Sequence, residues 1–425
     1  MSDEAQALLQ SGDIPGLLRH LRAHADGMEP AEAARLMAEA AARSGFEDLR
    51  EAAVAVAADP SDPQKLYDYG YACVERGVSF LAVPALRAAL ALVPGERALL
   101  TELVAALEDE WRHAEAVAVL DEHAADLWPW PDRYLLAYNA LMAGDLDRAS
   151  VEAERLPAPE DDGWLPARDR LARMLGRARA VRAVSPLDTR DLRGWHFALT
   201  GGVLATLSPF GFDDGMTGRY AYMGDGYATC RRSLDRLRLI LAAAGREPAA
   251  VGLLPDRSSR ILGLAAAEVL GLPAEPFDPA RPDVLVVAYD LNEADLDEAA
   301  ARGLWERAPG QVLFEHATCW TDPPPVSADI SGFLHQAVAK PWGERLRFDS
   351  DSGNVEQVPP DERPAEELAA EIVGTAPAVE EGDGTAPPDS DGVLSRFVSA
   401  VRDHWLSGPR DRVRSPGPVP SSRFQ

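Results

Sequence analysis

The sequence predicts a multidomain α plus α/β protein, in which an all-helical region precedes a domain built on a parallel sheet. Apolar and small residues recur at helical spacing, in pairs of helices, through the first 160 residues. Short strand patterns then alternate with helices, and a stretch rich in proline, glycine and acids follows. The expected parts are a helical-hairpin solenoid over 1–160, an α/β domain over 161–348, an acidic disordered linker over 349–392, an amphipathic helix over 393–407 and a disordered tail over 408–425.

Residues 63–96 have the pattern of one helix–turn–helix unit. Large apolar residues recur at helical spacing, small residues stand where two helices would meet, and a proline follows the second helix. A shift of 34 residues repeats the pattern, because it maps Leu66, Tyr69, Cys73, Ala82 and Leu86 onto Leu100, Leu103, Leu107, Ala116 and Leu120. One helix pair cannot bury its own apolar face, so we expect several pairs to stack.

The spacing of Leu66, Tyr69, Gly70, Ala82 and Pro94 resembles the tetratricopeptide repeat (TPR) family, over about residues 5–157. The resemblance implies a helical repeat whose first helices line a surface for protein binding. The function we expect is therefore a non-catalytic adaptor or regulator that binds a protein or peptide partner. The register of the family places six residues toward that partner: Lys65, Asp68, Arg97, Glu102, Arg133 and Tyr138.

A βαβαβ core is expected at about residues 250–316 of the α/β domain. Short apolar runs at 250–255, 283–290 and 311–317 read as buried strands, and amphipathic helices separate them. Such alternation implies parallel strands with right-handed crossovers. Because ligands bind at the carboxyl ends of parallel strands, attention falls on 255–260, 289–295 and 315–322.

A phosphate site is one interpretation of the sequence PDRSSR, which opens a helix directly after a strand. The backbone N–H groups of that helix end, with Arg257, Ser258, Ser259 and Arg260, have the chemistry to hold a phosphate, and Asp290 ends the next strand. The alternative is that Asp256 or Ser258 caps the helix.

Residues 250–316 resemble the phosphoribosyltransferase-like fold, in which a strand, a loop and a helix precede a second strand that bears the substrate loop. That family normally ends the second strand in two adjacent acids, followed by a hydroxyl- and glycine-rich phosphate loop. Here Tyr289 precedes Asp290, and Glu293 and Asp295 would repel a phosphate. The resemblance therefore implies a degenerate module. The alternative function is a phosphoribosyltransferase-like or nucleotide- or phosphate-binding enzyme domain that the repeats regulate.

His316 and Cys319 have the spacing of metal ligands. Zinc needs three or four ligands, and no neighbour in the sequence completes the set, so we expect a strand-end histidine with ordinary hydrogen bonds. Cys319 also lacks an identifiable base as a nucleophile, because His196 and His335 could approach it only through the fold. We therefore expect no catalytic residue, no metal and no cofactor.

The loop over residues 211–226 is glycine-rich, acidic and aromatic. Long loops inside a domain are often lids or binding loops, and Arg219 and Tyr220 make this one the preferred site for a small ligand, with a phosphorylated ligand as the candidate. Asp213, Asp214 and Asp225 could ligate a divalent cation, although no calcium-loop spacing is present. The alternative is a decorated turn with its tyrosines packed on the core.

The chain of 425 residues carries a net charge of −27, which argues against a nucleic-acid partner. Its three cysteines are too few for a disulfide framework, which favours a reducing, cytoplasmic environment. No apolar run reaches the ~20 residues of a membrane span, and no signal peptide is evident. Twelve acids against Arg363 alone within 351–392 predict a solvated linker.

The segment VLSRFVSAVRDHWLSG places Leu394, Phe397, Val398, Val401 and Trp405 on one helical face. A tethered amphipathic helix is a ligand for a groove, either on this chain or on another copy. Docking on another copy would make the protein a self-assembling structural protein, which is the third functional hypothesis. Membrane association is disfavoured, because an acidic stretch precedes the helix.

Overall fold

The computed structural model describes residues 3–348 and 355–423, and the chain divides into two compact units, 1–168 and 169–424. We expected the boundary near residue 160. The boundary lies later because Trp164 packs against Trp130 and Tyr134, with ring centroids 5.8 and 5.7 Å apart. Trp164, just before the boundary, therefore packs within the first unit.

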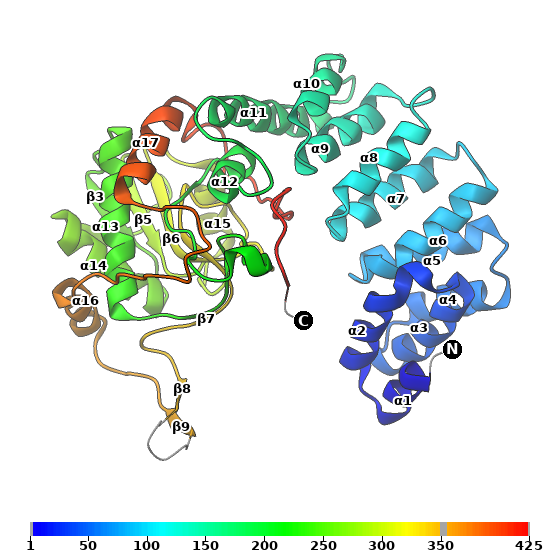
Figure 1. Cartoon of the computed structure of the whole chain (residues 1–425), viewed down its shortest axis with the longest axis horizontal. Helices are drawn as coiled ribbons and strands as arrows, with labels where there is room; N and C mark the ends of the chain where they lie inside the picture. Colours follow the sequence, from blue (N-terminus) through cyan, green and yellow to red (C-terminus); the bar gives the residue numbers. More distant parts are fainter. Residues whose placement is uncertain (1–2, 349–354, 424–425) are drawn as a thin grey trace. The chain divides into compact units, whose positions relative to one another are not determined.

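The first unit is a series of helices in which each helix from α3 to α9 packs on the next, and α1 packs on both α2 and α3 (Figure 1). Its helices are α1 Asp3–Ser11, α2 Ile14–His24, α3 Pro30–Ser44, α4 Glu47–Ala58, α5 Pro63–Glu75, α6 Ser79–Leu92, α7 Arg97–Asp109, α8 His113–Glu122, α9 Tyr134–Met142 and α10 Leu146–Glu154. The ten positions of the 34-residue match are all buried, as the periodicity predicts. The expected close approach is also present: a Cβ at Gly70 would lie 2.5 Å from Cγ of Leu86.

The second unit is built on a parallel sheet with the order β1-β7-β6-β5-β3-β4, and β2 also pairs with β7. Its strands are β1 Val203–Leu204, β2 Tyr220–Gly224, β3 Ala250–Leu253, β4 Ala274–Pro276, β5 Val284–Ala288, β6 Val312–Cys319 and β7 Ile330–Ala339. β1 pairs with the start of β7 and β2 with its end, so the two share one edge of the sheet. The three predicted strands are β3, β5 and β6.

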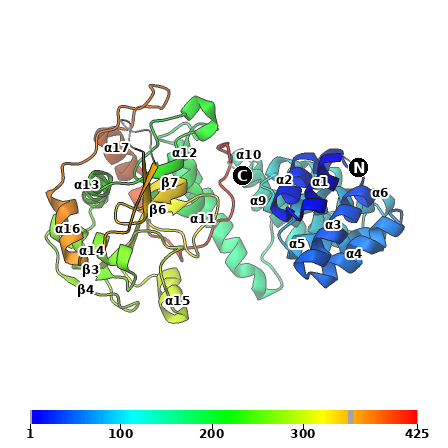
Figure 2. The same ribbon diagram turned by 90° about the horizontal axis from the view of Figure 1, so that it is seen from below.

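Helices cover both faces of the sheet (Figures 1 and 2). The helices of this unit are α11 Leu165–Arg182, α12 Leu192–Thr200, α13 Tyr227–Ala244, α14 Arg257–Leu270, α15 Glu298–Glu306, α16 Ala365–Gly374 and α17 Asp391–Val401. α13 and α14 lie on one face, where Gly263 of α14 lets the helix approach Val251 and Val287. α15 lies on the other, where Leu304 joins a core cluster with Val284 and Val286.

Most of the described part of the segment predicted as a disordered linker is packed on the second unit. α16 packs against α14 and α13, and its Leu368, Ala369 and Ile372 are buried. Acids of the segment also meet arginines of the unit, since Asp389 pairs with the buried Arg193 and Arg236. The prediction was wrong because charge counting does not show which acids have partners. Residues 349–354 lie outside the described residues; the flanking β8 Arg345–Phe348 and β9 Val355–Val358 form an antiparallel hairpin.

The predicted amphipathic helix is α17, which docks on α13 of the same chain with Leu394, Phe397, Val398 and Val401 buried. The segment expected as a disordered tail also packs, because Arg410 is buried and binds the Asp329 carboxylate at 2.7 Å. Tail arginines supply hydrogen bonds that composition alone does not reveal. Within the described residues, no helix combines the length and apolarity needed to cross a membrane.

Candidate functional site

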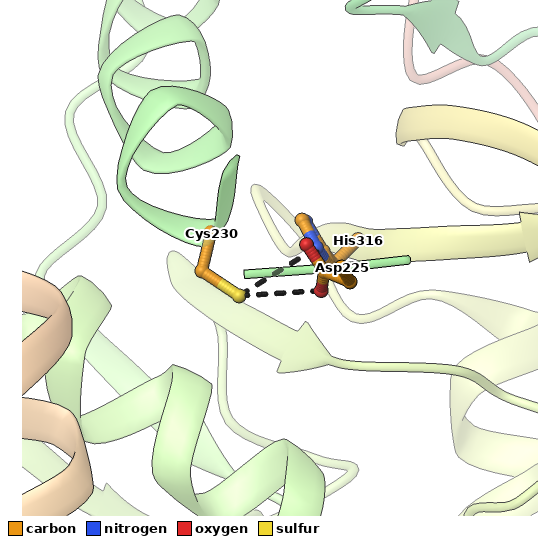
Figure 3. A group of neighbouring side chains, drawn as sticks. All are labelled: Asp225, Cys230 and His316. Carbon is orange, nitrogen blue, oxygen red and sulfur yellow. Dashed lines mark hydrogen bonds and ion pairs between the residues drawn. The ribbon is translucent and has the colours of Figure 1, made fainter. Parts of the chain in front are cut away.

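The carboxyl ends of the strands hold a fully buried polar cluster (Figure 3). Asp225 follows β2, and Cys230 stands in the first turn of α13. His316 lies in β6, and Tyr289 comes directly after β5. These four residues come from separate elements, and the parallel topology brings them together because neighbouring parallel strands end at one edge of the sheet. We call them the Asp225 cluster.

One oxygen of Asp225 is the centre of the Asp225 cluster. Its Oδ2 atom accepts hydrogen bonds from the Tyr289 hydroxyl at 2.6 Å and from the Cys230 thiol at 3.4 Å. His316 Nε2 lies 3.0 Å from the same oxygen, and Oδ1 accepts from the Gly226 N–H at 2.8 Å. A carboxylate offers only acceptors, so His316 carries a proton on Nε2. Every donor of the cluster therefore points at one negative charge.

Burial keeps the donors of the Asp225 cluster protonated. The pKa of the Cys230 thiol is raised well above its ordinary value, first by burial and then by the negative charge of Asp225. The pKa of Tyr289 is raised by the same two causes. A thiol that holds its proton is not a nucleophile, because that role needs the thiolate. The cluster therefore acts as a set of hydrogen-bond donors around a carboxylate.

The same residues also meet a spacing test for zinc. The sulfur of Cys230 is 3.4 Å from Asp225 Oδ2 and 3.8 Å from His316 Nε2, and the latter two atoms are 3.0 Å apart. Bond lengths of ~2.0–2.3 Å in a tetrahedron give ligand separations of about 3.3–3.6 Å. A zinc-bound histidine normally donates its other N–H to an acceptor, however, and Nδ1 of His316 has no partner among the described residues. The hydrogen-bonded form fits these residues better.

Two further side chains, Trp342 and Lys340, cover the Tyr289 side of the Asp225 cluster. The ring of Trp342 packs on Tyr289 with centroids 5.2 Å apart, and its indole N–H donates to the Ser258 hydroxyl at 3.0 Å. Nζ of Lys340 lies 5.8 Å from the centroid of the Tyr289 ring, and it pairs with Glu293. Burial raises the pKa of the neighbouring Asp290 and lowers the pKa of Lys340. The strand ends are therefore a charged but covered surface.

The residues predicted to hold a phosphate contact the chain itself. Arg257 donates to the carbonyls of Asp361 and Arg363 at 2.7 and 2.9 Å, and Arg260 pairs with Glu366 at 3.1 Å. Asp256 caps α14 by accepting from the N–H of Ser259 at 2.9 Å, as the capping alternative predicts. The Ser259 hydroxyl accepts from the N–H of Tyr289 at 3.0 Å. Segment 361–366 thus takes the partners that the phosphate interpretation assigned to a ligand.

The candidate ligand residues of the 211–226 loop do not come together at one site either. Asp213 pairs with Arg190 at 2.8 Å, Asp214 is exposed, and Asp225 lies in its own cluster, so the three acids do not form one cation site. The Tyr220 hydroxyl donates to Glu380 at 2.6 Å. Arg219, which directly precedes β2, is buried.

Cys319 does not share a site with His316, because its sulfur instead accepts from the Asp322 N–H at 3.4 Å. His316 was expected to be a strand-end histidine with ordinary hydrogen bonds; it lies inside β6, which continues to Cys319, and its Nε2 atom hydrogen-bonds to Asp225. Sequence reasoning missed its partners, although Asp225 and Cys230 flank the start of a helix that follows a strand. That placement is the signal that pointed to the same sheet edge.

Comparison with known proteins gives no relative: no family model matches the chain, and neither the curated proteins nor the solved structures include a significant match. The chemistry of the sites must therefore be argued from this chain alone.

Proposed function

We propose that this protein is a non-catalytic adaptor that binds a basic segment of a partner polypeptide through the first helices of its stacked pairs. The support comes from one surface of α5 and α7, made of Tyr67, Tyr71, Glu75, Glu102 and Asp109. We call it the acidic–aromatic patch. The rings of Tyr67 and Tyr71 stack with centroids 6.3 Å apart.

Glu102 is the residue that carries the proposal. It is only partly exposed, and within the described residues no cation pairs with it. Burial raises the pKa of Glu102, and the charges of Glu75 and Asp109 raise it further. Burial raises the pKa of Tyr67 on the neighbouring helix pair, and the charge of Glu102 raises it further. A lysine or arginine beside two tyrosine rings would relieve this repulsion and gain cation–π contact.

Several of the six residues predicted from the family register have structural partners instead. Lys65 pairs with Asp59 at 2.9 Å, Arg97 with the buried Asp132 at 3.2 Å, and Arg133 with the buried Glu152 at 3.3 Å. Asp68 accepts from Gln64 at 2.8 Å, and Tyr138 stacks on Tyr134. Glu102 is the member of the set that best fits a partner. The cations among the six hold loops and helices of the first unit in place.

The alternatives draw less support. The residues assigned to a phosphate at the start of α14 bind segment 361–366, and the Asp225 cluster is covered, so the geometry there does not favour a nucleotide enzyme. α17 is seated on its own α13, which leaves the self-assembly hypothesis without an available helix. The α/β unit is proposed as a degenerate module within the adaptor.

Peptide binding tests the proposal directly. A fluorescein-labelled lysine- and arginine-rich peptide should raise its anisotropy on titration with the full chain, whereas a glutamate-rich peptide of equal length should not. Glu102→Gln and Tyr67→Ala should each weaken binding by about tenfold, because each removes roughly 1–2 kcal/mol of charge or cation–π attraction. Glu51→Gln, an exposed acid on α4, is the matched control and should bind like the wild type. Equal affinity for both peptides would refute the proposal.

A further inference from the structure

A cavity in the α/β unit lies between α12, the end of β6 and the C-terminal segment. Its volume is about 70 Å³, which is several times the ~10–15 Å³ that one water molecule needs. α12 contributes His196, β6 contributes Thr318 and the loop after it Trp320, and the C-terminal segment contributes Val413 and Pro416. All of these residues belong to one unit.

Arg219 is the charged side chain of this cavity, and it is 1 % exposed. Within residues 3–348 and 355–423 no carboxylate pairs with it. Its guanidinium reaches only the carbonyls of Pro416 and Pro420, at 3.3 and 3.5 Å, which is at or beyond the usual hydrogen-bond range. Its Nε atom has no partner. The ring of Trp320 lies 5.2 Å from the guanidinium carbon and supplies the remaining contact.

A second polar side chain that lines the cavity, His196, also has a buried nitrogen atom, Nε2, without a hydrogen-bond partner in the described part of the chain. The pKa of His196 is lowered to about 4 by burial and by the positive charge of Arg219, so the imidazole is neutral and close to the guanidinium. A neutral imidazole has one N–H to donate. A buried cation without a counter-charge is costly, and a small anion would correct that cost while it accepts from both side chains.

We propose that this cavity is a binding site for a small oxyanion, a carboxylate or a phosphate, with Arg219 and His196 as its donors and the C-terminal segment as its cover. The volume fits an anion of about four or five heavy atoms. The weak contacts of Arg219 to two carbonyls are those that the oxyanion replaces. This site is separate from the acidic–aromatic patch, and it does not depend on the adaptor proposal.

Thermal unfolding of the full chain tests the site. Acetate and inorganic phosphate are titrated separately against sodium chloride at matched ionic strength. At a concentration roughly 100-fold above Kd, the bound anion should raise Tm of the α/β unit by about 5–10 °C, and chloride should not. The arm that responds identifies the anion as a carboxylate or a phosphate. No rise with either anion in the wild type would overturn the proposal, whatever any variant does.

Variants assign the effect to the cavity. Arg219→Met removes the buried charge and should melt at or above the wild-type temperature in chloride, while it loses the response to the anion. Arg190→Met removes an exposed arginine that pairs with Asp213, and it should keep the full response. An Arg219→Met protein that still responds, or that melts far below the wild type without anion, would contradict the assignment.

Discussion

Glu315 is a carboxylic acid without exposed surface, and it gives the α/β unit a specific pH dependence. Its Oε1 atom accepts from the Leu291 N–H at 2.8 Å, and its Oε2 atom accepts from the Thr318 hydroxyl at 2.6 Å. Burial raises the pKa of Glu315 from 4.5 to about 8, because those two hydrogen bonds offset only part of the desolvation. The native state therefore holds a proton that the unfolded chain releases.

The sign of the effect follows from that difference. The proton held by native Glu315 stabilises the fold fully below pH 4.5, and this contribution is lost as pH rises through about 8. Glu315→Gln mimics the protonated acid, so its free energy of unfolding relative to wild type should rise by about 1.4 kcal/mol per pH unit at most across that window. Urea unfolding between pH 5 and pH 9 measures this difference. The exposed Glu298→Gln is the control, and parallel pH profiles for Glu315→Gln and wild type would contradict the prediction.

The Asp225 cluster shows which residues of a buried site can be predicted from the sequence. The sequence placed His316 at the end of a strand, and parallel topology brought attention to that edge. It did not name Asp225 and Cys230 as partners, because these residues are 91 and 86 positions away in the chain. The distances from Asp225 and Cys230 to His316 depend on the pairing of β2 with β7. The composition of the 211–226 loop does not predict that pairing.

At the scale of elements, the closest helix contact predicted from the sequence is that between α5 and α6. A Cβ at Gly70 would lie 2.5 Å from Cγ of Leu86, which is the branch point of that side chain and not its flexible end. Gly70→Leu should therefore lower the free energy of unfolding by about 1–3 kcal/mol, the usual cost of overpacking, even though leucine has the better helix propensity. Chemical unfolding followed by far-UV circular dichroism measures the loss.

Two variants separate packing from propensity. Gly176 lies in α11 with no atom within 4 Å of a Cβ, so Gly176→Leu should be neutral or slightly stabilising. Leu86→Ala in the Gly70→Leu background should recover part of the loss, because it opens the space that the new side chain needs. A Gly70→Leu protein as stable as wild type would show that these two helices do not meet as the repeat pattern requires.

The sequence predicts the helices and strands that have a regular apolar pattern of their own. It does not predict the elements whose structure depends on contacts with neighbouring elements. β3 and β5 are continuous apolar runs and β6 opens with one before it reaches Glu315, and all three strands are buried, as is typical of parallel strands covered on both faces. β7 carries Ser331, Gly332, His335 and Gln336, so its pattern is broken although it is the longest strand described. β1, β2 and β4 are short and depend on a partner strand for their hydrogen bonds. α16 lies in the segment predicted as a linker, because the sequence does not show the α14 surface that buries it.

At the scale of the whole molecule, the chain has two compact units with separate cores, and their stabilities should be separable. The second unit depends on its C-terminal segment. Arg410 is buried, binds Asp329 at 2.7 Å and also lies 3.0 Å from the Gln311 side chain. Arg307 pairs with the same aspartate, so loss of Arg410 leaves Asp329 with one cation.

A crossed pair of variants tests this independence. Arg410→Met should destabilise only the second unit, by about 3 kcal/mol, because it breaks a buried ion pair and leaves polar groups without a donor. Gly70→Leu should act only on the first unit. Scanning calorimetry of the two variants and of the exposed control Arg396→Met should show each substitution shifting a different transition. If one substitution moved both transitions together, the two units would fold as one cooperative body, and the proposed peptide-binding surface could not be treated as separate from the α/β module.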